Sequence, residues 1–437
     1  MKTLRNILTA MLLAVLTAPA AFASSSLMTA AAAGKGEPQR LRWRQPTIRI
    51  AVSDSLTQPS VNIKTDSDVM GAFRRSIEAW QSVADIEFVT EFSTSQNVSP
   101  SGPAGDGISL ITIAATNENA LLFAASPDTE SAKTRVFYNA RGFITEADIV
   151  LNPYQQFSTD GTFGTFDLES TLTHEIGHLL GVRHSSVLGS TMSESILKNG
   201  AFGFAGTASR SLAESDIAAI RELYGDRADG EACCAVITGK LTTASGRSAK
   251  GVRVWAEESG SGRVIAQTEV QTDGSYRLGG LRDGNYSVFW QKSEAGVSPI
   301  GQLGGVDLKA NETRVLSDRI FLGKPGVALK YIGVGDQLAD SAVAFEAGRT
   351  YSVYLGGENL VPADLKIEFN SRFFRVSKPV AVEGDFGKGV SVVSFNVTVD
   401  EDTPLGVYSV FATGADGILG SLVGAMRVSP ATFRLNN

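Results

Sequence analysis

All three histidines of the 437-residue chain lie in one stretch, His174-Glu175-Ile176-Gly177-His178-Leu179-Leu180-Gly181-Val182-Arg183-His184. On a helix, positions i and i+4 lie one turn apart on the same face, so we expect His174 and His178 to reach the same metal ion. Gly181 tolerates the left-handed backbone that ends a helix, and a turn there lets His184 approach from another direction. Three imidazoles leave one tetrahedral position open for water, as in a catalytic zinc site.

Glu175 follows the first of these predicted ligands, so its carboxylate is expected to reach the metal-bound water. Zinc lowers the pKa of such a water toward ~7, and the carboxylate accepts its proton as the water attacks a carbonyl. The short pattern H-E-x-x-H also arises by chance in solvated helices, but the long pattern is far more specific. The stretch therefore predicts a zinc-dependent hydrolase with Glu175 as general base.

The long pattern H-E-x-x-H-x-x-G-x-x-H resembles that of the metzincin zinc proteases, and Ser185 after the third histidine is similar to the matrixin branch. Ser190-Thr191-Met192-Ser193 resembles the Met-turn of that family, in which a methionine forms an apolar floor beneath the metal. The alternative for Met192 is ordinary gap filling in a core. The resemblance covers residues 42–226 and implies an α+β domain with a twisted, mostly parallel sheet and three helices.

The resemblance also implies an edge strand that binds the substrate. Leu122-Phe123-Ala124-Ala125, ahead of Ser126-Pro127, looks like the L-A-H-A-x-x-P strand of the family without its histidine. These four residues are predicted to pair with the backbone of an extended peptide. No histidine remains for the second, structural zinc of animal matrixins, so one catalytic zinc is expected. Calcium is a further option, and its predicted ligands are Asp106, Asp128, Glu146 and Asp148. The alternative is that these acids only lie on the solvated surface, as scattered acids usually do.

Hydrophobic periodicity places the main elements of this domain. Alternation over residues 48–52 predicts a strand, and apolar residues at helical spacing over residues 69–83 predict an amphipathic helix. Asp167 and Ser170 are both candidate caps for the helix that carries the histidines. A last helix is predicted from Ala213 to Tyr224, with Gly225 as its stop.

The first residues of the chain predict export. Lys2 and Arg5 precede an apolar run, and Ala21-Phe22-Ala23 fits the small-residue cleavage rule, so residues 1–23 are predicted to be a signal peptide. A membrane anchor is the alternative, but the run is short for a span. Residues 24–41 are predicted to be a flexible linker, without a cysteine that could cap the zinc. The protein is expected to be secreted, either extracellular or periplasmic.

Beyond residue 226 the pattern changes to short strands separated by turns. Residues 235–323 contain Asp-Gly turn pairs and resemble carboxypeptidase regulatory-like β-sandwich modules. Residues 325–437 resemble bacterial immunoglobulin-like β-sandwich modules. The chain is thus expected to be multidomain, and the two all-β modules are expected to bind a surface or carbohydrate. The adjacent Cys233 and Cys234 allow a vicinal disulfide, a link between chains or free thiols. Of these interpretations we favour one in which the two cysteines have no structural role.

Charge and composition narrow the partners. The net charge of −7 comes without a basic stripe, which argues against nucleic acid, and no later stretch is long and apolar enough for a membrane helix. The leading hypothesis is a secreted zinc endopeptidase that cleaves peptide bonds of extracellular proteins. The alternative is a surface- or matrix-binding β-sandwich protein with a vestigial or self-processing protease domain.

Overall fold

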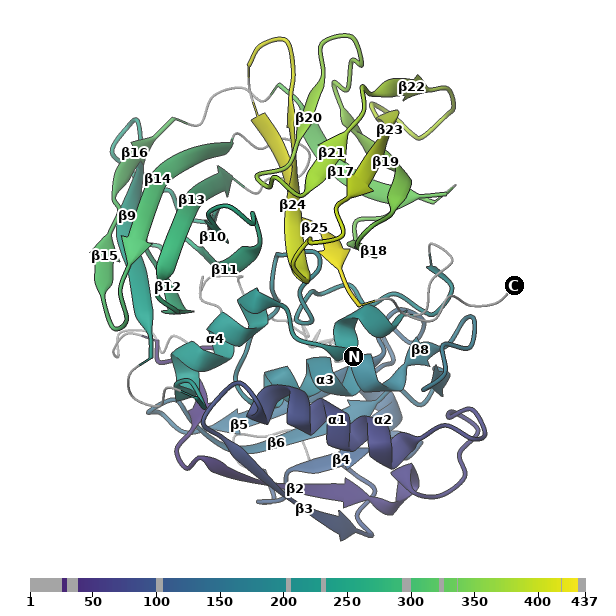
Figure 1. The fold of residues 1–437 in the computed structure, drawn as a ribbon. Coiled ribbons are helices and arrows are strands. Elements are labelled where there is room, and N and C mark those ends of the chain that lie inside the picture. The colour runs from purple at the N-terminus through teal and green to yellow at the C-terminus, as the bar shows by residue number, and fades with distance from the viewer. Residues whose placement is uncertain are drawn as a thin grey trace, which may run out of the picture.

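A computed structural model describes residues 26–29, 38–99, 105–201, 206–228, 233–292, 300–321, 326–335, 337–417 and 419–430. The predicted signal peptide, residues 1–23, lies outside the described residues. The helices gather with one sheet at one end of the molecule, and two all-β units lie side by side at the other end (Figure 1). We refer to the first part, up to residue 228, as the α/β unit.

One six-stranded sheet forms the base of the α/β unit. Its strands follow the order β1-β6-β4-β2-β3, and β5 pairs with β6 at the opposite edge. Every pair is parallel except β5 with β6, so the predicted mostly parallel sheet is confirmed. The strands are β1 (Arg42–Trp43), β2 (Thr47–Ser53), β3 (Glu87–Ser93), β4 (Leu110–Thr112), β5 (Ala132–Tyr138) and β6 (Phe143–Leu151).

Within the described residues of this unit, four α-helices accompany the sheet, where the sequence predicts three. The predicted helices correspond to α1 (Val69–Gln81), α3 (Leu168–Leu179) and α4 (Glu214–Tyr224). The additional helix, α2 (Asn117–Leu121), is five residues long and too short to give a periodic signal. Short elements complete the unit: η1 (Asp54–Leu56), the pair β7 (Phe157–Ser158) and β8 (Phe166–Asp167), and η3 (Gly206–Arg210).

The core of the α/β unit lies between the sheet and the crossing helices α1 and α3. Trp80 of α1 is fully buried, and its indole N–H donates to the carbonyl of Thr173 in α3 at 2.8 Å. Ser76, one turn earlier, donates to the carbonyl of Glu169 at 3.0 Å. These contacts fix the rotation of α3 about its own axis, which decides where its histidines point.

The described residues of the predicted linker over residues 24–41 have backbone partners, and its flexibility stays a prediction. Leu27 N–H donates to the carbonyl of Gly181 at 2.7 Å, and Leu41 N–H donates to that of Leu27 at 2.8 Å. Ser26 is fully buried, and Thr29 N–H donates to Gln39 O at 2.8 Å. The Ser- and Ala-rich composition suggests disorder, but these backbone groups find partners at the end of α3 and in each other.

The first all-β unit contains two sheets over its own apolar core. One sheet has the order β11-β10-β13-β14, and the other has β12-β9-β15 with β16 also on β9. The strands are β9 (Ala235–Thr243), β10 (Val252–Glu258), β11 (Val264–Glu269), β12 (Ser275–Leu281), β13 (Gly284–Lys292), β14 (Ile300–Leu308), β15 (Thr313–Val315) and β16 (Asp318–Ile320). Just before β9, Cys233 and Cys234 are joined by a disulfide bond, which is the first of the three predicted possibilities.

The second all-β unit has the same plan of two sheets over a separate core. Its sheets have the orders β17-β19-β23-β21, with β22 also on β23, and β18-β25-β24-β20. The strands are β17 (Ala328–Val334), β18 (Val343–Phe345), β19 (Thr350–Glu358), β20 (Lys366–Glu368), β21 (Phe374–Val376), β22 (Val380–Val382), β23 (Ser391–Val399), β24 (Gly406–Thr413) and β25 (Leu419–Val428). Among the described residues, no helix has the length and apolar character needed to cross a membrane.

The three units meet at a shared apolar junction. Its members are buried and come from all three parts of the chain: Val187, Ala213, Trp255, Val264, Phe289, Val407, Phe411 and Val423. Glu257 lies near this junction, where it accepts hydrogen bonds from Trp255 Nε1 at 2.9 Å and from Asn370 Nδ2 at 3.0 Å. Burial of apolar side chains stabilises such a contact. The all-β units are therefore packed onto the α/β unit rather than strung after it.

Candidate metal centre

Helix α3 begins and ends where its sequence provides caps. Asp167 is the N-cap, and its carboxylate accepts the N–H of Ser170 at 2.8 Å. At the other end, Gly181 adopts a φ of 91°, and a Cβ there would lie 2.2 Å from the carbonyl oxygen of Leu41. Only glycine fits both this left-handed backbone and this close approach. The predicted cap and the predicted helix stop are both confirmed.

The last carbonyls of α3 have side-chain partners. Trp43 Nε1 donates to the carbonyl of Leu179 at 2.9 Å, and the Tyr224 hydroxyl donates to that of Leu180 at 2.7 Å. Helix ends leave such carbonyls without intrahelical donors, so these bonds satisfy groups that are otherwise open. They also fix the exit direction of the chain toward His184.

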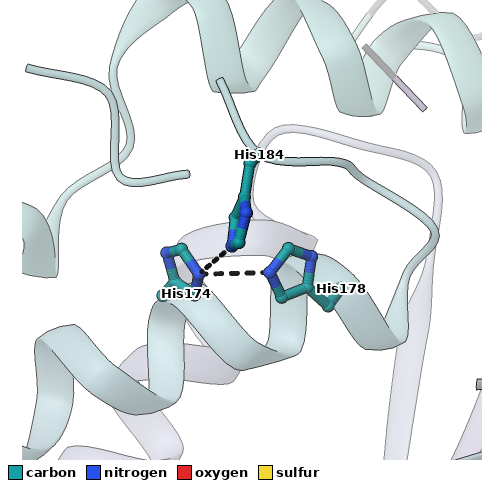
Figure 2. A group of neighbouring side chains, drawn as sticks. All are labelled: His174, His178 and His184. Carbon is teal, nitrogen blue, oxygen red and sulfur yellow. Dashed lines mark hydrogen bonds between the residues drawn. The ribbon is translucent and has the colours of Figure 1, made fainter. Parts of the chain in front are cut away.

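The three imidazoles converge on one point (Figure 2). His174 Nε2 lies 3.1 Å from His178 Nε2 and 3.2 Å from His184 Nε2. A tetrahedral zinc ion with Zn–N distances of about 2.0–2.1 Å holds its nitrogens roughly 3.3 Å apart. This is the one group of three or more His, Cys, Asp or Glu residues found placed to hold a metal within the part of the chain that the structure describes. The donor set and spacing fit zinc.

The outward ring nitrogens determine which nitrogen is free for a metal. His174 Nδ1 lies 2.8 Å from the carbonyl oxygen of Thr191, and His178 Nδ1 lies 2.9 Å from that of Val182. A carbonyl can only accept, so both Nδ1 atoms carry the proton and both Nε2 lone pairs face the centre. Burial, with a smaller contribution from the nearby His184, lowers the pKa of His174 to about 4, and burial also lowers the pKa of His178. Both rings are therefore neutral near pH 7, which is the form that binds metal.

Glu175 follows His174 on α3, is buried and is held by strand β5. The Thr134 hydroxyl lies 2.5 Å from Glu175 Oε2 and 3.1 Å from the Glu175 carbonyl oxygen. Burial raises the pKa of the Glu175 carboxyl to about 7, and the hydrogen bond from Thr134 opposes this shift. A carboxyl with a pKa near the working pH is suited to take up and release a proton.

Met192 lies against α3 between the two helical ligands. It is fully buried, and a Cβ added at Gly177 would lie 2.3 Å from the Met192 sulfur and 2.7 Å from Trp80. The turn that carries it closes on itself, because Ser185 N–H donates to the Met192 carbonyl at 2.7 Å. The sulfur and the indole therefore support α3 at the point from which the ligands project. We call residues 185–193 the Met192 turn.

We expect Gly177→Ala to loosen this support, because the added methyl group has no space without moving Met192 or Trp80. Overpacking of this kind costs about 1–3 kcal/mol. Urea unfolding of the full chain and zinc competition with a chelator should both show the loss. Ala218→Gly in α4, a buried helix position away from the centre, also costs about 1 kcal/mol of stability and is therefore the control for zinc affinity, which it should leave unchanged. Unchanged stability and zinc affinity in Gly177→Ala would contradict the packing described here.

Asp216 of α4 organises the Met192 turn from behind. Its buried carboxylate accepts N–H bonds from Thr191 at 2.8 Å and from Ala213 at 2.9 Å, and a hydroxyl bond from Ser190. Thr191 in turn donates its hydroxyl to the carbonyl of Ser211 at 2.7 Å. Asp216 thus fixes the residue whose carbonyl orients His174.

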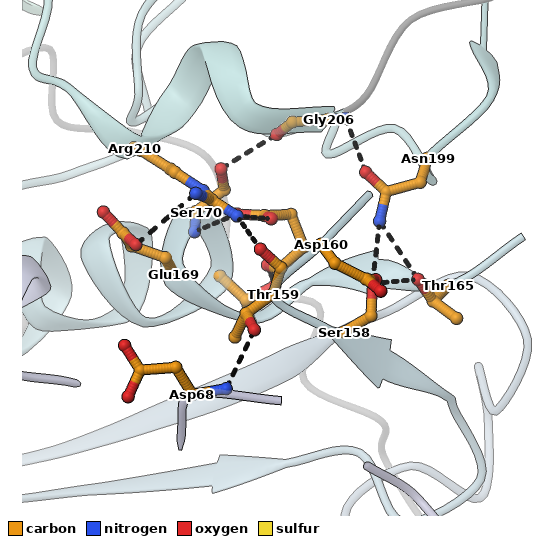
Figure 3. Close-up of polar contacts among 12 residues, drawn as sticks. Asp68, Ser158, Thr159, Asp160, Thr165, Glu169, Ser170, Asn199, Gly206 and Arg210 are labelled. Atoms are coloured by element: carbon orange, nitrogen blue, oxygen red, sulfur yellow. Dashed lines mark hydrogen bonds and ion pairs between the residues drawn. The ribbon is translucent and has the colours of Figure 1, made fainter. Parts of the chain in front are cut away.

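The start of α3 is tied to the loop that follows the Met192 turn (Figure 3). Arg210 contacts the N-cap with two bonds, Nε to Asp167 Oδ1 at 3.0 Å and Nη2 to Asp167 Oδ2 at 2.6 Å, and also donates to the carbonyl of Thr159 at 2.7 Å. Ser170 donates to the carbonyl of Gly206 at 2.9 Å (Figure 3). Asn199 donates to Thr165 Oγ1 at 3.0 Å. The described ends of this loop are thereby fixed to the zinc helix.

The predicted substrate strand is wrong: Leu122, Phe123, Ala124 and Ala125 form turns that continue α2. Thr116 caps this helix by accepting the N–H of Asn119 at 3.2 Å, which starts helical bonding. Phe123 and Ala124 then donate their N–H groups to carbonyls three residues back, at 3.1 and 3.3 Å. Phe123 is also fully buried. These N–H groups are used within the segment and are not free for a peptide.

The acids considered for calcium are only partly brought together. Glu146 and Asp148 are buried on β6, but their oxygens accept bonds from the chain. Asp148 accepts N–H bonds from Ser99 at 2.9 Å and from Leu110 at 3.0 Å, and Glu146 accepts the Ser99 hydroxyl at 2.5 Å. Burial, opposed by the N–H bonds from Leu110 and Ser99 and assisted by the charge of Glu146, raises the pKa of Asp148 to about 6. These carboxylates hold the loop before β4, and a calcium site stays a prediction.

Comparison with known proteins agrees with this geometry. Residues 42–225 match the matrixin family of peptidases. Residues 42–225 are thus similar to a matrixin domain. It is 29% identical over 189 residues to Metalloendoproteinase 1-MMP of Arabidopsis thaliana, covering 42% of this chain and 44% of that protein. It is 50% identical over 60 residues to Metalloendoproteinase 1 of Glycine max, covering 14% and 17%. The matched region thus spans less than half the length of these relatives. The matrixin match and these relatives support a zinc metalloendopeptidase.

Solved structures add little for the all-β units. The major pilin subunit BcpA of Bacillus cereus aligns with 43% of this chain and 66% of its own, at 12% identity and a TM-score of 0.19. A likeness at that TM-score carries no argument about fold or function. What these units do in this protein has to come from their own contacts.

Two features of the centre were missed at the level of sequence. Thr134 holds Glu175, yet it lies 41 residues away in a strand whose pattern shows nothing unusual. Asp216 lies in the predicted last helix, but its contact with the Met192 turn depends on how α4 packs. Neither residue belongs to the histidine pattern, so no local signal pointed to either.

Proposed function

We propose that the protein is a secreted zinc endopeptidase that hydrolyses peptide bonds of extracellular proteins. The observation that carries the proposal is the convergence of three Nε2 atoms, together with the buried carboxylate of Glu175, which follows His174 on α3 and is held by Thr134. Export is part of the proposal and rests on the sequence of residues 1–23. Binding of a surface or carbohydrate by the all-β units stays a prediction.

Each residue has one task in this proposal. His174, His178 and His184 hold the metal, which when bound supplies the Lewis acidity that makes water a nucleophile near neutral pH. Glu175 accepts the proton of the attacking water and later delivers it to the leaving amine. Thr134 keeps the Glu175 carboxylate in place through its hydroxyl. Met192 packs against α3 at Gly177 and takes no part in proton transfer.

Strand β5 replaces residues 122–125 as the proposed site of peptide pairing. It pairs with β6 on one side, and its Thr134 reaches Glu175, so its other edge lies next to the centre. Asn152 N–H donates to the carbonyl of Ser131, so every second residue of β5, counted from Ser131, bonds to β6. Antiparallel strands use alternate residues for bonding, so Thr134 and Val136 turn their backbone groups to the free edge. An extended peptide can add there as a further strand.

We expect Val136→Pro to weaken peptide binding, because it removes an N–H group on the free edge while the bonds to β6 stay. Loss of one such bond corresponds to about a 3- to 10-fold lower kcat/KM. Val136→Ala is the matched control, since it also shortens the side chain but keeps the N–H. Equal kinetics for the two folded variants on a long peptide would place the substrate elsewhere.

Hydrolysis of casein or gelatin by the full chain, with and without a metal chelator, tests the proposed function. The proposal predicts internal cleavage that stops with the chelator and returns when zinc is added. A protein that binds zinc but cleaves neither these proteins nor a broad peptide mixture would instead match the alternative of a vestigial domain.

A further inference from the structure

Arg427 connects the second all-β unit to the centre of the matrixin domain. It lies on β25, which pairs with β18 on one side and with β24 on the other, so its backbone is rigidly held. The guanidinium donates to the carbonyl of Gly189 at 2.7 Å and to that of Ser211 at 2.5 Å, and to the Ser211 hydroxyl at 3.0 Å. Arg427 is only 6% exposed. A buried charge with three well-placed acceptors is a specific contact, not a chance surface pairing.

These acceptors lead directly to the first metal ligand. Gly189 belongs to the Met192 turn, and the Ser211 carbonyl also accepts the hydroxyl of Thr191. The carbonyl of Thr191 accepts His174 Nδ1–H at 2.8 Å. Three hydrogen bonds in series therefore join strand β25 to a ring nitrogen of the proposed site. Groups that orient a metal-binding histidine affect affinity for the metal as well as catalysis.

The backbone around Gly189 lies directly on the second all-β unit. Leu188 N–H donates to the carbonyl of Val423 at 3.0 Å, and a Cβ at Gly189 would lie 2.9 Å from the carbonyl oxygen of Gly424. The first all-β unit contacts the same turn near its start, where Ser186 donates to Gln267 Oε1 at 2.9 Å. The segment between the third ligand and Met192 is thus held by both all-β units.

The buried charge also has compensating neighbours in the matrixin domain. Burial lowers the pKa of the Arg427 guanidinium, and the carboxylates of Asp216 and Glu214 oppose that shift. Asp216 is the residue that holds the Met192 turn from the other side. Arg427 and Asp216 therefore hold the Met192 turn from two different units. Arg427 donates to a carbonyl of this turn, and Asp216 accepts from its N–H groups.

We propose that Arg427 is a positioning residue of the metal centre: it holds the Met192 turn, and through Thr191 it sets the orientation of His174. The second all-β unit is then a structural part of the protease and not only an appended binding module. This inference rests on the proposed function in one respect, since it takes His174 to be a zinc ligand.

The test compares full-length Arg427→Met and Arg427→Lys with the wild type. Two quantities are measured: the dissociation constant for zinc, by competition with a chelator, and kcat and KM on a peptide. We expect Arg427→Met to bind zinc about 10- to 100-fold more weakly and to lose kcat with little change in KM. Arg427→Lys keeps a donor near the carbonyls and should recover part of the loss. Arg375→Met, which breaks an exposed pair with Asp400 in the same unit, is the matched control and should change neither quantity.

A second variant covers the case in which Arg427→Met does not fold, as judged by circular dichroism. Gly189→Ala leaves β25 and its pairing intact but pushes the turn away from Gly424, so we expect weaker zinc binding from it as well. Zinc affinity equal to the wild type in Gly189→Ala and in the folded Arg427 variants would overturn the inference. Zinc affinity does not depend on hydrolysis. A wild type that binds zinc but cleaves nothing would therefore count against the proposed function alone.

Discussion

Glu175→Ala is expected to abolish peptide hydrolysis while zinc stays bound. The carboxylate is buried on the same helix as two of the ligands, is not one of the grouped ligands and is assigned to the water, so its removal takes away proton transfer and leaves the three imidazoles in place. General acid–base groups contribute about 10²- to 10⁴-fold, so kcat should fall by at least ~100-fold. Single-turnover and steady-state kinetics on one peptide, together with metal analysis, measure both parts of the expectation.

Two further variants sharpen this experiment. Glu175→Gln keeps the shape of the side chain and its contact with Thr134 but cannot accept the proton, so it should be as inactive as Glu175→Ala. Glu130→Ala removes a partly exposed carboxylate that pairs with Lys133 nearby and should leave hydrolysis intact. Near-normal activity in either Glu175 variant would reject the assigned role.

Arg210→Met is expected to cause the largest loss of stability in the matrixin domain. Asp167, the N-cap of α3, is 1% exposed at its side chain, and Arg210 is its bidentate partner. Removal of Arg210 leaves the buried Asp167 carboxylate with the Ser170 N–H as its remaining partner, and breaking a buried pair in this way costs up to about 3–5 kcal/mol. Urea unfolding followed by a tryptophan signal should show a large decrease in the midpoint for this part of the chain, since Trp80 packs on α3.

The matched control is Lys64→Met, which breaks the exposed ion pair with Asp160 in the same region. Exposed pairs contribute about 0–1 kcal/mol, so this variant should unfold close to the wild type. If Arg210→Met is no less stable than Lys64→Met, the bond between Arg210 and Asp167 does not hold the start of the zinc helix.

The sequence was sufficient where local chemistry decides the structure. The spacing of His174 and His178, the cap at Asp167 and the turn at Gly181 each follow from helix geometry or glycine conformation, and the structure confirms them. The same holds for the boundaries of α1 and α4, because their apolar residues recur at helical spacing.

The sequence was not sufficient where partners come from far along the chain. Residues 122–125 read as a strand by resemblance, but the cap at Thr116 makes them continue a helix. The segment near Leu27 reads as disordered by composition, but its backbone bonds to Gly181. Arg427 lies 238 positions from the glycine whose carbonyl it binds, and no periodicity in either segment indicates that contact. Tertiary contacts of this kind are visible only once the units are packed together.

The most direct test of the central claim is the zinc stoichiometry of the purified full-length protein. We predict one tightly bound zinc ion per chain in the wild type and in Glu175→Ala, and none in His184→Ala. Two tightly bound zinc ions, no zinc at all, or full zinc binding after the loss of His184 would contradict a single centre built from the three histidines.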